Sequence, residues 1–440
     1  MNNSLSLAKL IPIGLMLFSS FFGAGNLIFP PLFGFLAGSN LSMAALGFCI
    51  TGVGLPLIGV LAIAFKGTDN VNALMDPVSK TYAKVMMFIT ALTIGPLFAI
   101  PRTAAVSYEV GIKPLLNGTN DGMYLAIYSA LFFIATAYVA LNPSKVVTWL
   151  GKILTPVMLL CLGALFISVF MAPAIELPAP QGDFATAPFL QGFVEGYNTM
   201  DLLAASLFGA VTVSAIKLYG ITDRKQITRS CFLAGIVATV CLAVIYYCLA
   251  YAGAESVRYL GEGRHFSNGS GILIACTTHY LGTYGQMILG VIILLACLTT
   301  SIGLTAAISD YFGIMSKGKI AERTFALGIT IFSFAASNVG LDNIISFAVP
   351  VLCVLYPIII TSSVVNILGP VFNDEPLVYR YSLVLVTIFA CIDGIKALGV
   401  SIPGEAFLQS CLPLYADGFG WLTVGIAGMI IGFIHSKITK

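Results

Sequence analysis

Helix-breaking residues interrupt the first long apolar stretch of the chain. Residues 22–31 read Phe-Gly-Ala-Gly-Asn-Leu-Ile-Phe-Pro-Pro. The two glycines lower helix propensity, and Pro30 lacks the amide that would bond to the carbonyl of Asn26. If this stretch lies in hydrocarbon, a broken helix is tolerable only where it lines a cavity. Its freed amides could then bind a carboxylate and its freed carbonyls a cation; the alternative is a kinked helix with close glycine packing.

A second apolar stretch, residues 192–209, contains glycines, hydroxyls, an amide and two carboxylic acids. Asp201 lies near its middle, where an ionised carboxylate is costly in a membrane and is usually functional. The alternative is a structural carboxylate that pairs with a neighbour or caps half of a broken helix. Both interpretations predict an interrupted or polar-lined helix in this stretch.

Hydroxyl groups lie along one face of a third stretch, residues 295–303. Ala296, Thr299 and Thr300 are spaced i, i+3 and i+4, which places them on the same side of a helix. Two hydroxyls and a freed carbonyl offer the hard oxygen donors that an alkali cation prefers. The alternative is that each hydroxyl bonds back to its own helix. The combination with the broken first stretch favours a cation site.

The composition indicates that these stretches lie in a membrane. The 440 residues are 58% hydrophobic and only 9% charged, whereas a soluble globular chain is about a quarter charged. An ordinary soluble enzyme is therefore excluded, and a formal net charge of +2 gives no reason to expect a nucleic-acid partner. The ten cysteines and three histidines show no ligand spacing, so we expect no cofactor other than a coupling ion, and no obligatory protein partner.

About twelve segments are long and apolar enough to cross a bilayer as helices. The first is interpreted as a retained helix rather than a signal peptide, because it continues without a clear cleavage site. Residues 254–283 are too polar to span and are predicted to form a structured external loop with short helices. The twelve segments are 10–37, 41–65, 81–110, 122–140, 146–171, 190–216, 227–253, 284–313, 322–338, 344–367, 378–398 and 417–436.

The basic residues predict the orientation of these segments. Most Lys and Arg residues fall in the loops and termini on the N-terminal side of the membrane. Only Lys113, Arg258, Arg264 and Lys396 fall in loops on the other side. Because cytoplasmic loops are rich in Lys and Arg, both termini are predicted to face the cytoplasm.

The interrupted segments occupy matching places in two halves of similar length. Residues 10–171 contain five segments and residues 190–367 contain five more, followed by two additional helices in residues 378–436. Since five is odd, the second half enters the membrane from the opposite side. Broken first helices in two inverted halves are typical of a secondary transporter with a site at the midplane. A channel would need a filter-like repeat and an intramembrane enzyme a nucleophile and base, and the sequence offers neither.

These motifs resemble the bacterial branched-chain amino acid carrier family, the branched-chain amino acid:cation symporters. The resemblance covers nearly the whole chain and is most specific in residues 22–31, 196–201 and 297–300. It implies the leucine-transporter-like fold, an all-α membrane protein with two inverted five-helix repeats and two peripheral helices. It also implies import of leucine, isoleucine and valine with a coupling cation.

The resemblance also implies residue roles. The amides of Ala24 and Gly25 would bind the substrate carboxylate. A second sodium site would need Asn26 and a hydroxyl, but Ala204 occupies the position of that hydroxyl, which argues against it. The first sodium site would use the carbonyls of Ser19, Phe22 and Ala296 and the hydroxyls of Thr299 and Thr300. The candidate substrate residues are Phe22, Gly23, Ala24, Gly25, Asn26, Asn198, Thr199, Asp201, Ser206 and Phe208.

The substrate side chain is expected to lie in an apolar pocket that accepts several branched side chains. The expected function is therefore sodium-coupled import of branched-chain amino acids across the bacterial cytoplasmic membrane. The alternatives are proton coupling, with Asp201 as the titrating group, or another small amino acid or amine as substrate. Arg102, Glu109, Asp310 and Asp393 are expected to snorkel, cap or pair near the ends of segments. The expected pocket residues are Phe21, Phe22, Leu203, Leu207 and Phe208.

Overall fold

The structure is a computed structural model that describes residues 5–68, 70–116, 120–141, 154–171, 176–261, 264–415 and 418–439. All regular secondary structure in these ranges is helical. The first helices are α1 (Leu7–Phe21), α2 (Ala24–Ala37), α3 (Leu41–Cys49), α4 (Leu55–Lys66), α5 (Lys80–Leu92), α6 (Ala99–Gly111), α7 (Asp121–Ala140) and α9 (Thr155–Phe170). The remaining helices are α10 (Pro188–Glu195), α11 (Asp201–Lys217), α12 (Arg224–Glu255), α13 (Val257–Leu260), α14 (Ser270–Met315), α15 (Glu322–Ser337), α16 (Leu341–Leu368), α17 (Pro376–Ala397), α18 (Glu405–Cys411) and α19 (Gly420–Ile438).

Each of the twelve expected segments falls on one helix or on a run of helices, apart from residues 146–153, which lie outside the described residues. Eight helical stretches in the described part of the chain are long and apolar enough to span a membrane, and the bent pair α10–α11 adds a ninth. The number is below twelve because α9 and α15 have only 16 residues each, and because Ala24–Lys66 counts as one stretch. The chain is a multi-pass, all-helical membrane protein.

The first segment is broken, at a position slightly earlier than the sequence predicts. Helix α1 ends at Phe21 and α2 begins at Ala24, with Phe22 and Gly23 extended between them. Pro30 does not stop the helix, because it lies inside α2. Helix α2 packs closely on α12 at its prolines: a Cβ on Gly253 of α12 would lie 2.1 Å from the carbonyl oxygen of Pro31.

The sixth segment is broken as predicted. Helix α10 is followed by a tight turn over Gly196–Thr199, and Met200 then takes a left-handed conformation with φ 65° before α11 begins. The two parts meet at an angle of 50°. The segment therefore presents an irregular backbone in the middle of an otherwise apolar region.

The third segment is also broken, which the sequence did not lead us to expect. The turn Thr93–Leu97 separates α5 from α6, and Gly95 within it has non-helical angles. The signal was present as Gly95-Pro96, because glycine favours irregular backbone and proline lacks an amide. Helix α6 therefore restarts in mid-segment, and Arg102 lies in its first turns.

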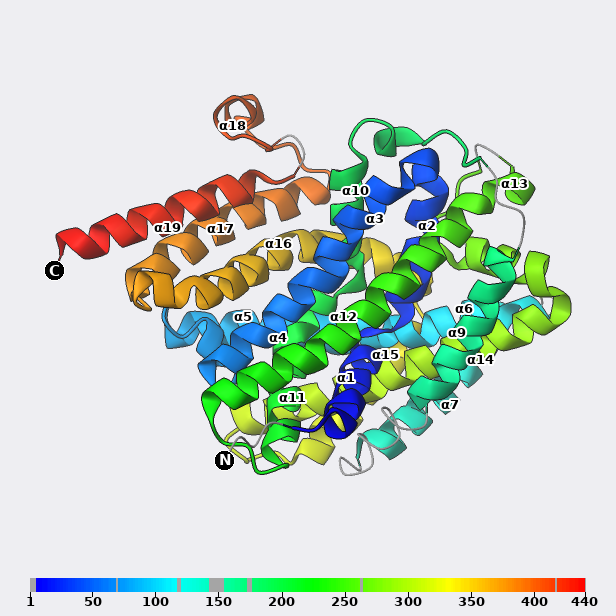
Figure 1. Ribbon diagram of the computed structural model, residues 1–440, viewed down its shortest axis with the longest axis horizontal. Helices are drawn as coiled ribbons and strands as arrows, with labels where there is room; N and C mark the ends of the chain where they lie inside the picture. The colour runs from blue at the N-terminus through cyan, green and yellow to red at the C-terminus, as the bar shows by residue number, and fades with distance from the viewer. Residues whose placement is uncertain are drawn as a thin grey trace.

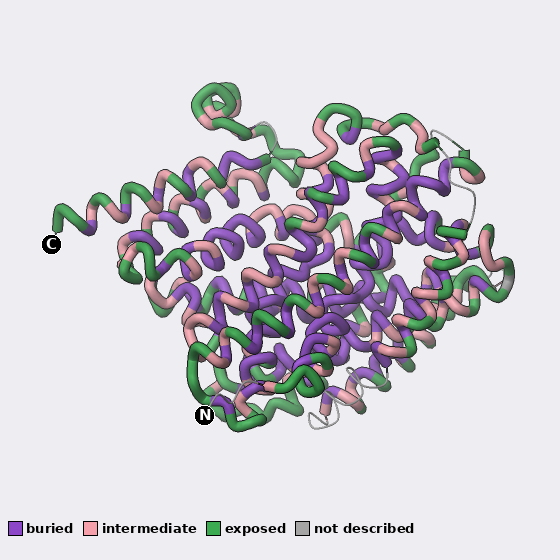
Figure 2. The backbone as a smooth tube through the Cα atoms, in the orientation of Figure 1, coloured by how far each residue is buried: buried purple, intermediate pink, exposed green. Residues whose placement is uncertain are grey.

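The described residues of the range 254–283, which are 254–261 and 264–283, include helical pieces, as predicted. They include the short helix α13 and the first part of α14, which is kinked at Gly282. The last two long helices, α17 and α19, lie side by side at one edge of the molecule (Figure 1), where α17 also packs against α16. Buried residues are concentrated in the interior (Figure 2), and they include the residues at the breaks of the first and sixth segments.

Candidate functional site

A narrow cavity lies where the breaks in the first, third and sixth segments meet. Its volume is about 20 Å³, so the cavity is nearly closed in this conformation. Helices α2, α6, α11 and α14 all contribute to its wall. The lining residues are Ser20, Phe21, Gly23, Ala24, Gly25, Asn26, Ile94, Ala99, Arg102, Thr103, Thr199, Met200, Asp201, Ala204, Phe208, Thr300 and Leu304.

The start of α2 presents backbone amides to this cavity. The amide of Gly23 is already bound, because it donates to Asn26 Oδ1 at 3.0 Å. The next residues, Ala24 and Gly25, line the cavity and belong to the first turn of α2, whose amides have no partner within the helix. A helix N-terminus of this kind favours a bound anion.

A buried hydrogen-bonded triad joins three helices beside the cavity. The side-chain amide of Asn26 donates to Asp201 Oδ2 at 2.6 Å and also contacts the hydroxyl of Tyr246 in α12. The Tyr246 hydroxyl in turn donates to Asp201 Oδ2 at 3.1 Å. The sequence predicted Asn26 and Asp201 but not Tyr246, which lies among other tyrosines of α12 and carries no distinguishing local pattern.

Freed carbonyls of α1 meet a hydroxyl of α14 near the same cavity. The hydroxyl of Thr300 lies 3.2 Å from the carbonyl oxygen of Phe22 and 3.4 Å from that of Ser20. In a continuous helix the amide of Gly23 would donate to the carbonyl of Ser19. Here it donates to Asn26 instead, so it does not bond to that carbonyl.

The other predicted ligand hydroxyl has a different partner. Thr299 donates to the carbonyl of Ala296 in its own helix at 2.9 Å, as in the alternative interpretation of these hydroxyls. Thr299 and Ala296 are fully buried. Of the two threonines, only Thr300 therefore bonds to the broken first segment. The carbonyl oxygen of Ser20, which the sequence analysis did not include, lies beside the predicted ligand oxygens.

Arg102 lies inside the molecule, and not at the end of a segment, where we expected it to snorkel, cap or pair. Its side chain is 3% exposed. The guanidinium donates to the carbonyls of Asn198, at 2.7 Å, and Thr199, at 3.3 Å, in the turn between α10 and α11. It also lies over the ring of Phe29, with 5.5 Å from Cζ to the ring centre. The break before α6 brings it there.

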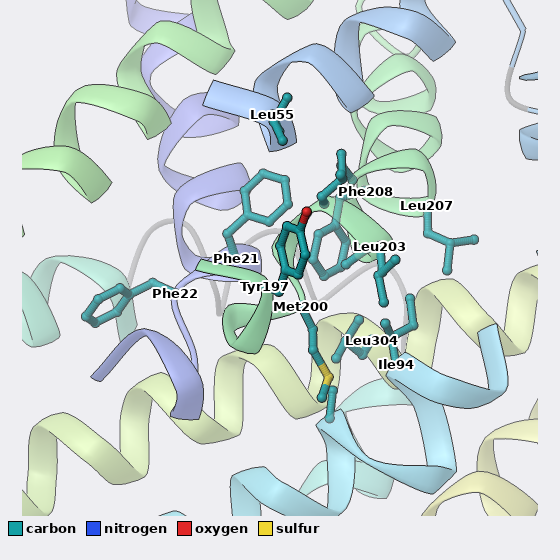
Figure 3. Packing of buried hydrophobic residues seen from close by; sticks show 14 of the residues in the cluster. Phe21, Phe22, Leu55, Ile94, Tyr197, Met200, Leu203, Leu207, Phe208 and Leu304 are labelled. Atoms are coloured by element: carbon teal, nitrogen blue, oxygen red, sulfur yellow. The ribbon is translucent and has the colours of Figure 1, made fainter. Parts of the chain in front are cut away.

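The apolar wall of the cavity only partly follows the expected pocket. Phe21 and Phe208 line it and pack edge to face, with ring centres 5.3 Å apart. Phe22 points the opposite way (Figure 3) and stacks on Phe18, so only its backbone faces the site. Leu203 and Leu207 are buried but do not line the cavity, and their places are taken by Ile94, Met200 and Leu304.

The remaining candidates have local roles. The side chain of Asn198 donates to Glu195 at 3.1 Å, and its carbonyl, not its side chain, faces Arg102. Thr199 donates to the carbonyl of Gly196 at 2.9 Å and lines the cavity. Ser206 is 2% exposed and does not line it.

The other charged residues that had no predicted role lie apart from this cavity. Glu109 lies near the end of α6 and Asp393 near the end of α17, as expected. Asp310 lines a larger cavity between α1, α7, α11, α14 and α15, with a volume of about 430 Å³. This larger cavity reaches Ser20 and Phe208, which also line the narrow one. The two cavities therefore lie on either side of Ser20 and Phe208.

Comparison with known sequences places the whole chain in one group. Residues 6–439 match the family described as branched-chain amino acid transport protein. The chain is 41% identical over 438 residues to branched-chain amino acid permease BrnQ of Bacillus subtilis (strain 168), which covers 99% of this chain and 98% of the relative. It is 36% identical over 431 residues to the branched-chain amino acid transport system 2 carrier protein of Pseudomonas aeruginosa PAO1, with 98% and 96% covered.

Solved structures share the fold at low sequence identity. Mhp1, a nucleobase-cation-symport-1 family transporter, matches in a closed, ligand-bound conformation with a TM-score of 0.63 at 14% identity, covering 97% of this chain and 92% of that one. MhsT in complex with L-phenylalanine matches with a TM-score of 0.54 at 15% identity, covering 96% and 98%. The fold is thus that of the leucine-transporter-like secondary transporters, as the sequence predicted.

Proposed function

Since the chain belongs to the family of branched-chain amino acid transport proteins, we propose that it imports leucine, isoleucine and valine by symport with sodium. A transport family also agrees with the expectation that the chain is not an enzyme. The observation that carries the proposal is the meeting of two broken helices at one buried cavity, which holds the N-terminus of α2 and the carboxylate of Asp201. Alternating access around such a site moves a bound solute across the membrane.

The chemistry of the cavity supports a zwitterionic substrate with an apolar side chain. The α2 amides offer donors for a carboxylate, and Asp201 offers an acceptor for an ammonium group. Phe21, Phe208 and Leu304 supply apolar wall. Because a methylene in an apolar pocket discriminates by only about 1–3 kcal/mol, we expect overlapping affinity for the three branched side chains.

Sodium is proposed as the coupling ion because oxygen donors gather at the break. The hydroxyl of Thr300 and the carbonyls of Phe22 and Ser20 lie together, and the carbonyls of Ser19 and Ala296 with the Thr299 hydroxyl complete the proposed set. These uncharged oxygens suit an alkali cation. We propose that the chain lies in the bacterial cytoplasmic membrane with both termini in the cytoplasm, as the distribution of Lys and Arg indicates.

A proton-coupled carrier is the second candidate, and Asp201 is the observation that favours it. This carboxylate is 3% exposed and its Oδ2 accepts hydrogen bonds from Asn26 and Tyr246. A buried carboxylate that is alternately exposed to the two sides could carry a proton. A carrier for another small amino acid or an amine would retain the same site with different apolar lining.

Uptake of labelled leucine into proteoliposomes separates these candidates. We expect an inward sodium gradient to stimulate uptake and a pH gradient alone to leave it unchanged; the reverse result would favour proton coupling. Unlabelled isoleucine and valine should compete. Asp201→Asn should abolish uptake, because it removes the proposed ammonium acceptor, whereas Asp183→Asn in an exposed turn should not. Absence of stimulation by either gradient would exclude symport of leucine.

A further inference from the structure

A buried arginine faces the same cavity as the buried aspartate. Arg102 is 3% exposed and lines the cavity together with Asp201. Among the described residues, no carboxylate lies within ion-pairing distance of its guanidinium; its side-chain hydrogen bonds go to the carbonyls of Asn198 and Thr199. Its Nε is buried and has no hydrogen-bond partner among the described residues. Its charge interacts with that of Asp201 only from beyond ion-pairing distance, and a buried cation without an anion in direct contact is costly.

The guanidinium lies directly against the start of α2. A Cβ placed on Gly25 would lie 2.7 Å from Arg102 Nη2 and 3.1 Å from the carbonyl oxygen of Asn198. No side chain larger than a hydrogen fits at position 25 without displacing the arginine. The α2 amides, which need an anion, and the guanidinium, which needs one too, therefore share one corner of the cavity.

The two charges of the cavity are held in fixed positions relative to each other. Arg102 Nη2 donates to the Thr199 carbonyl, and the amide of Asp201 bonds to the Thr199 hydroxyl at 3.4 Å. One residue of the broken sixth segment therefore connects a fixed cation to a fixed anion. An α-amino acid also carries one anion and one cation, because a carboxylate and an ammonium group are both attached to its Cα.

We infer that Arg102 binds the carboxylate of the transported amino acid, in concert with the amides of Ala24 and Gly25, while Asp201 accepts the ammonium group. The inference rests on the proposed function and names the group that recognises the substrate. A guanidinium suits this task because its planar donors match a carboxylate in a bidentate geometry. Together the two charges select a free α-amino acid over an amine, an amide or an ester.

With Arg102 and the α2 amides as carboxylate donors, the site should strongly reject ligands that have no carboxylate. A ligand without a carboxylate leaves the arginine and the α2 amides buried and unpaired. Sites built to pair with a polar group reject analogues that lack it far more strongly than apolar pockets reject a missing methylene. The apolar wall would then discriminate between substrate side chains, and Arg102 would discriminate between ligands with and without a carboxylate.

Binding of leucine and of leucinamide to the purified full-length protein tests the inference. Leucinamide has the same side chain and amine but no carboxylate. We expect the wild-type protein to prefer leucine. Arg102→Gln should weaken leucine binding about 10- to 100-fold, the value of hydrogen bonds to a charged group, and should leave leucinamide binding unchanged or tighter. Arg229→Gln, at an exposed position of α12, is the matched control and should change neither.

The outcomes distinguish a binding role from a structural one. If Arg102 only braces the turn before α11, Arg102→Gln will weaken both ligands equally, and the inference is wrong. Unchanged leucine binding would also overturn it. If the glutamine variant aggregates, Arg102→Lys decides by the same comparison, because lysine keeps the charge and loses the planar fork; leucine alone should weaken. A wild-type protein that binds no branched-chain amino acid would instead contradict the proposed function.

Discussion

At the scale of single residues, the site is built from polar groups whose partners come from other helices. Asn26 of α2 contacts Asp201 of α11 and Tyr246 of α12, and Thr300 of α14 contacts the end of α1. A buried polar group is stable only when it is paired, so each of these contacts ties the conformation of one broken helix to that of a neighbour. Binding of an ion or substrate can therefore move several helices together.

Thr300 offers the sharpest test of the proposed sodium site. Thr300→Val keeps the shape of the side chain and removes the hydroxyl that faces the carbonyls of Phe22 and Ser20. Loss of one oxygen ligand should raise the sodium concentration for half-maximal leucine uptake about tenfold. Thr300→Ser, which keeps the hydroxyl, should behave much like wild type.

The same substitution at Thr299 tests the second hydroxyl, which bonds to Ala296 in this structure. If Thr299 turns to the ion, Thr299→Val will also raise the sodium requirement of uptake. Unchanged sodium dependence in both valine variants would place the cation elsewhere.

At the scale of elements, the broken sixth segment is held in place by close backbone contacts with its neighbours. A Cβ on Gly192 of α10 would lie 2.0 Å from the carbonyl oxygen of Ala44 in α3, and one on Gly47 would lie 2.1 Å from that of Phe189. Thr51 adds a hydrogen bond to the carbonyl of Phe193 at 2.8 Å. Small residues allow this approach between helices in a membrane, and the approach positions the turn that carries the Asn198 and Thr199 carbonyls.

Substitution of Gly192 should therefore destabilise the fold. Gly192→Ala forces α10 away from α3, and we expect it to lower the free energy of unfolding by about 1–3 kcal/mol, as overpacking does. Thermal unfolding of the detergent-solubilised protein, followed by the monodisperse fraction, measures the change. Gly163→Ala in α9, where nothing lies within 4 Å of the added methyl, is the control. Equal melting temperatures for the two variants would show that the contact between Gly192 and the Ala44 carbonyl does not limit the side chain at position 192.

At the scale of the whole molecule, we propose that the larger cavity is the access route to the site from one side. It lies between α1, α7, α11, α14 and α15 and shares the lining residues Ser20 and Phe208 with the narrow cavity. The proposed orientation places its mouth on the cytoplasmic side, together with the N-terminus. The chain would then be open to the cytoplasm in this conformation.

Thiol labelling tests both the orientation and the access route. In a background without other cysteines, Ala306→Cys in the wall of the larger cavity should react with an impermeant maleimide in inside-out vesicles and not in right-side-out vesicles. A second variant that keeps only the native Cys411 of α18, which is exposed, should show the opposite pattern and serves as the control. Labelling of Ala306→Cys from the outer face alone would reverse the orientation.

The sequence alone determined the class of the protein and most of its helical segments, since apolar length and the placement of glycine, proline and buried carboxylic acids are local signals. The broken first and sixth segments, Asp201 and the group around Thr300 could be predicted for this reason. The break at Gly95-Pro96 had a local signal as well, and it was missed.

Only the tertiary structure decided which of these groups meet. Asn26 and Asp201 are separated by 175 positions and Asn26 and Tyr246 by 220, and no local pattern relates them. Arg102 was expected near a helix end and instead lies at the centre of the site, because the packing of α6 against α14 and α2 decides where its guanidinium points. Likewise, whether the side chain or the carbonyl of Phe22 faces the cavity depends on two backbone angles between α1 and α2, and these angles are set by the helices packed around them.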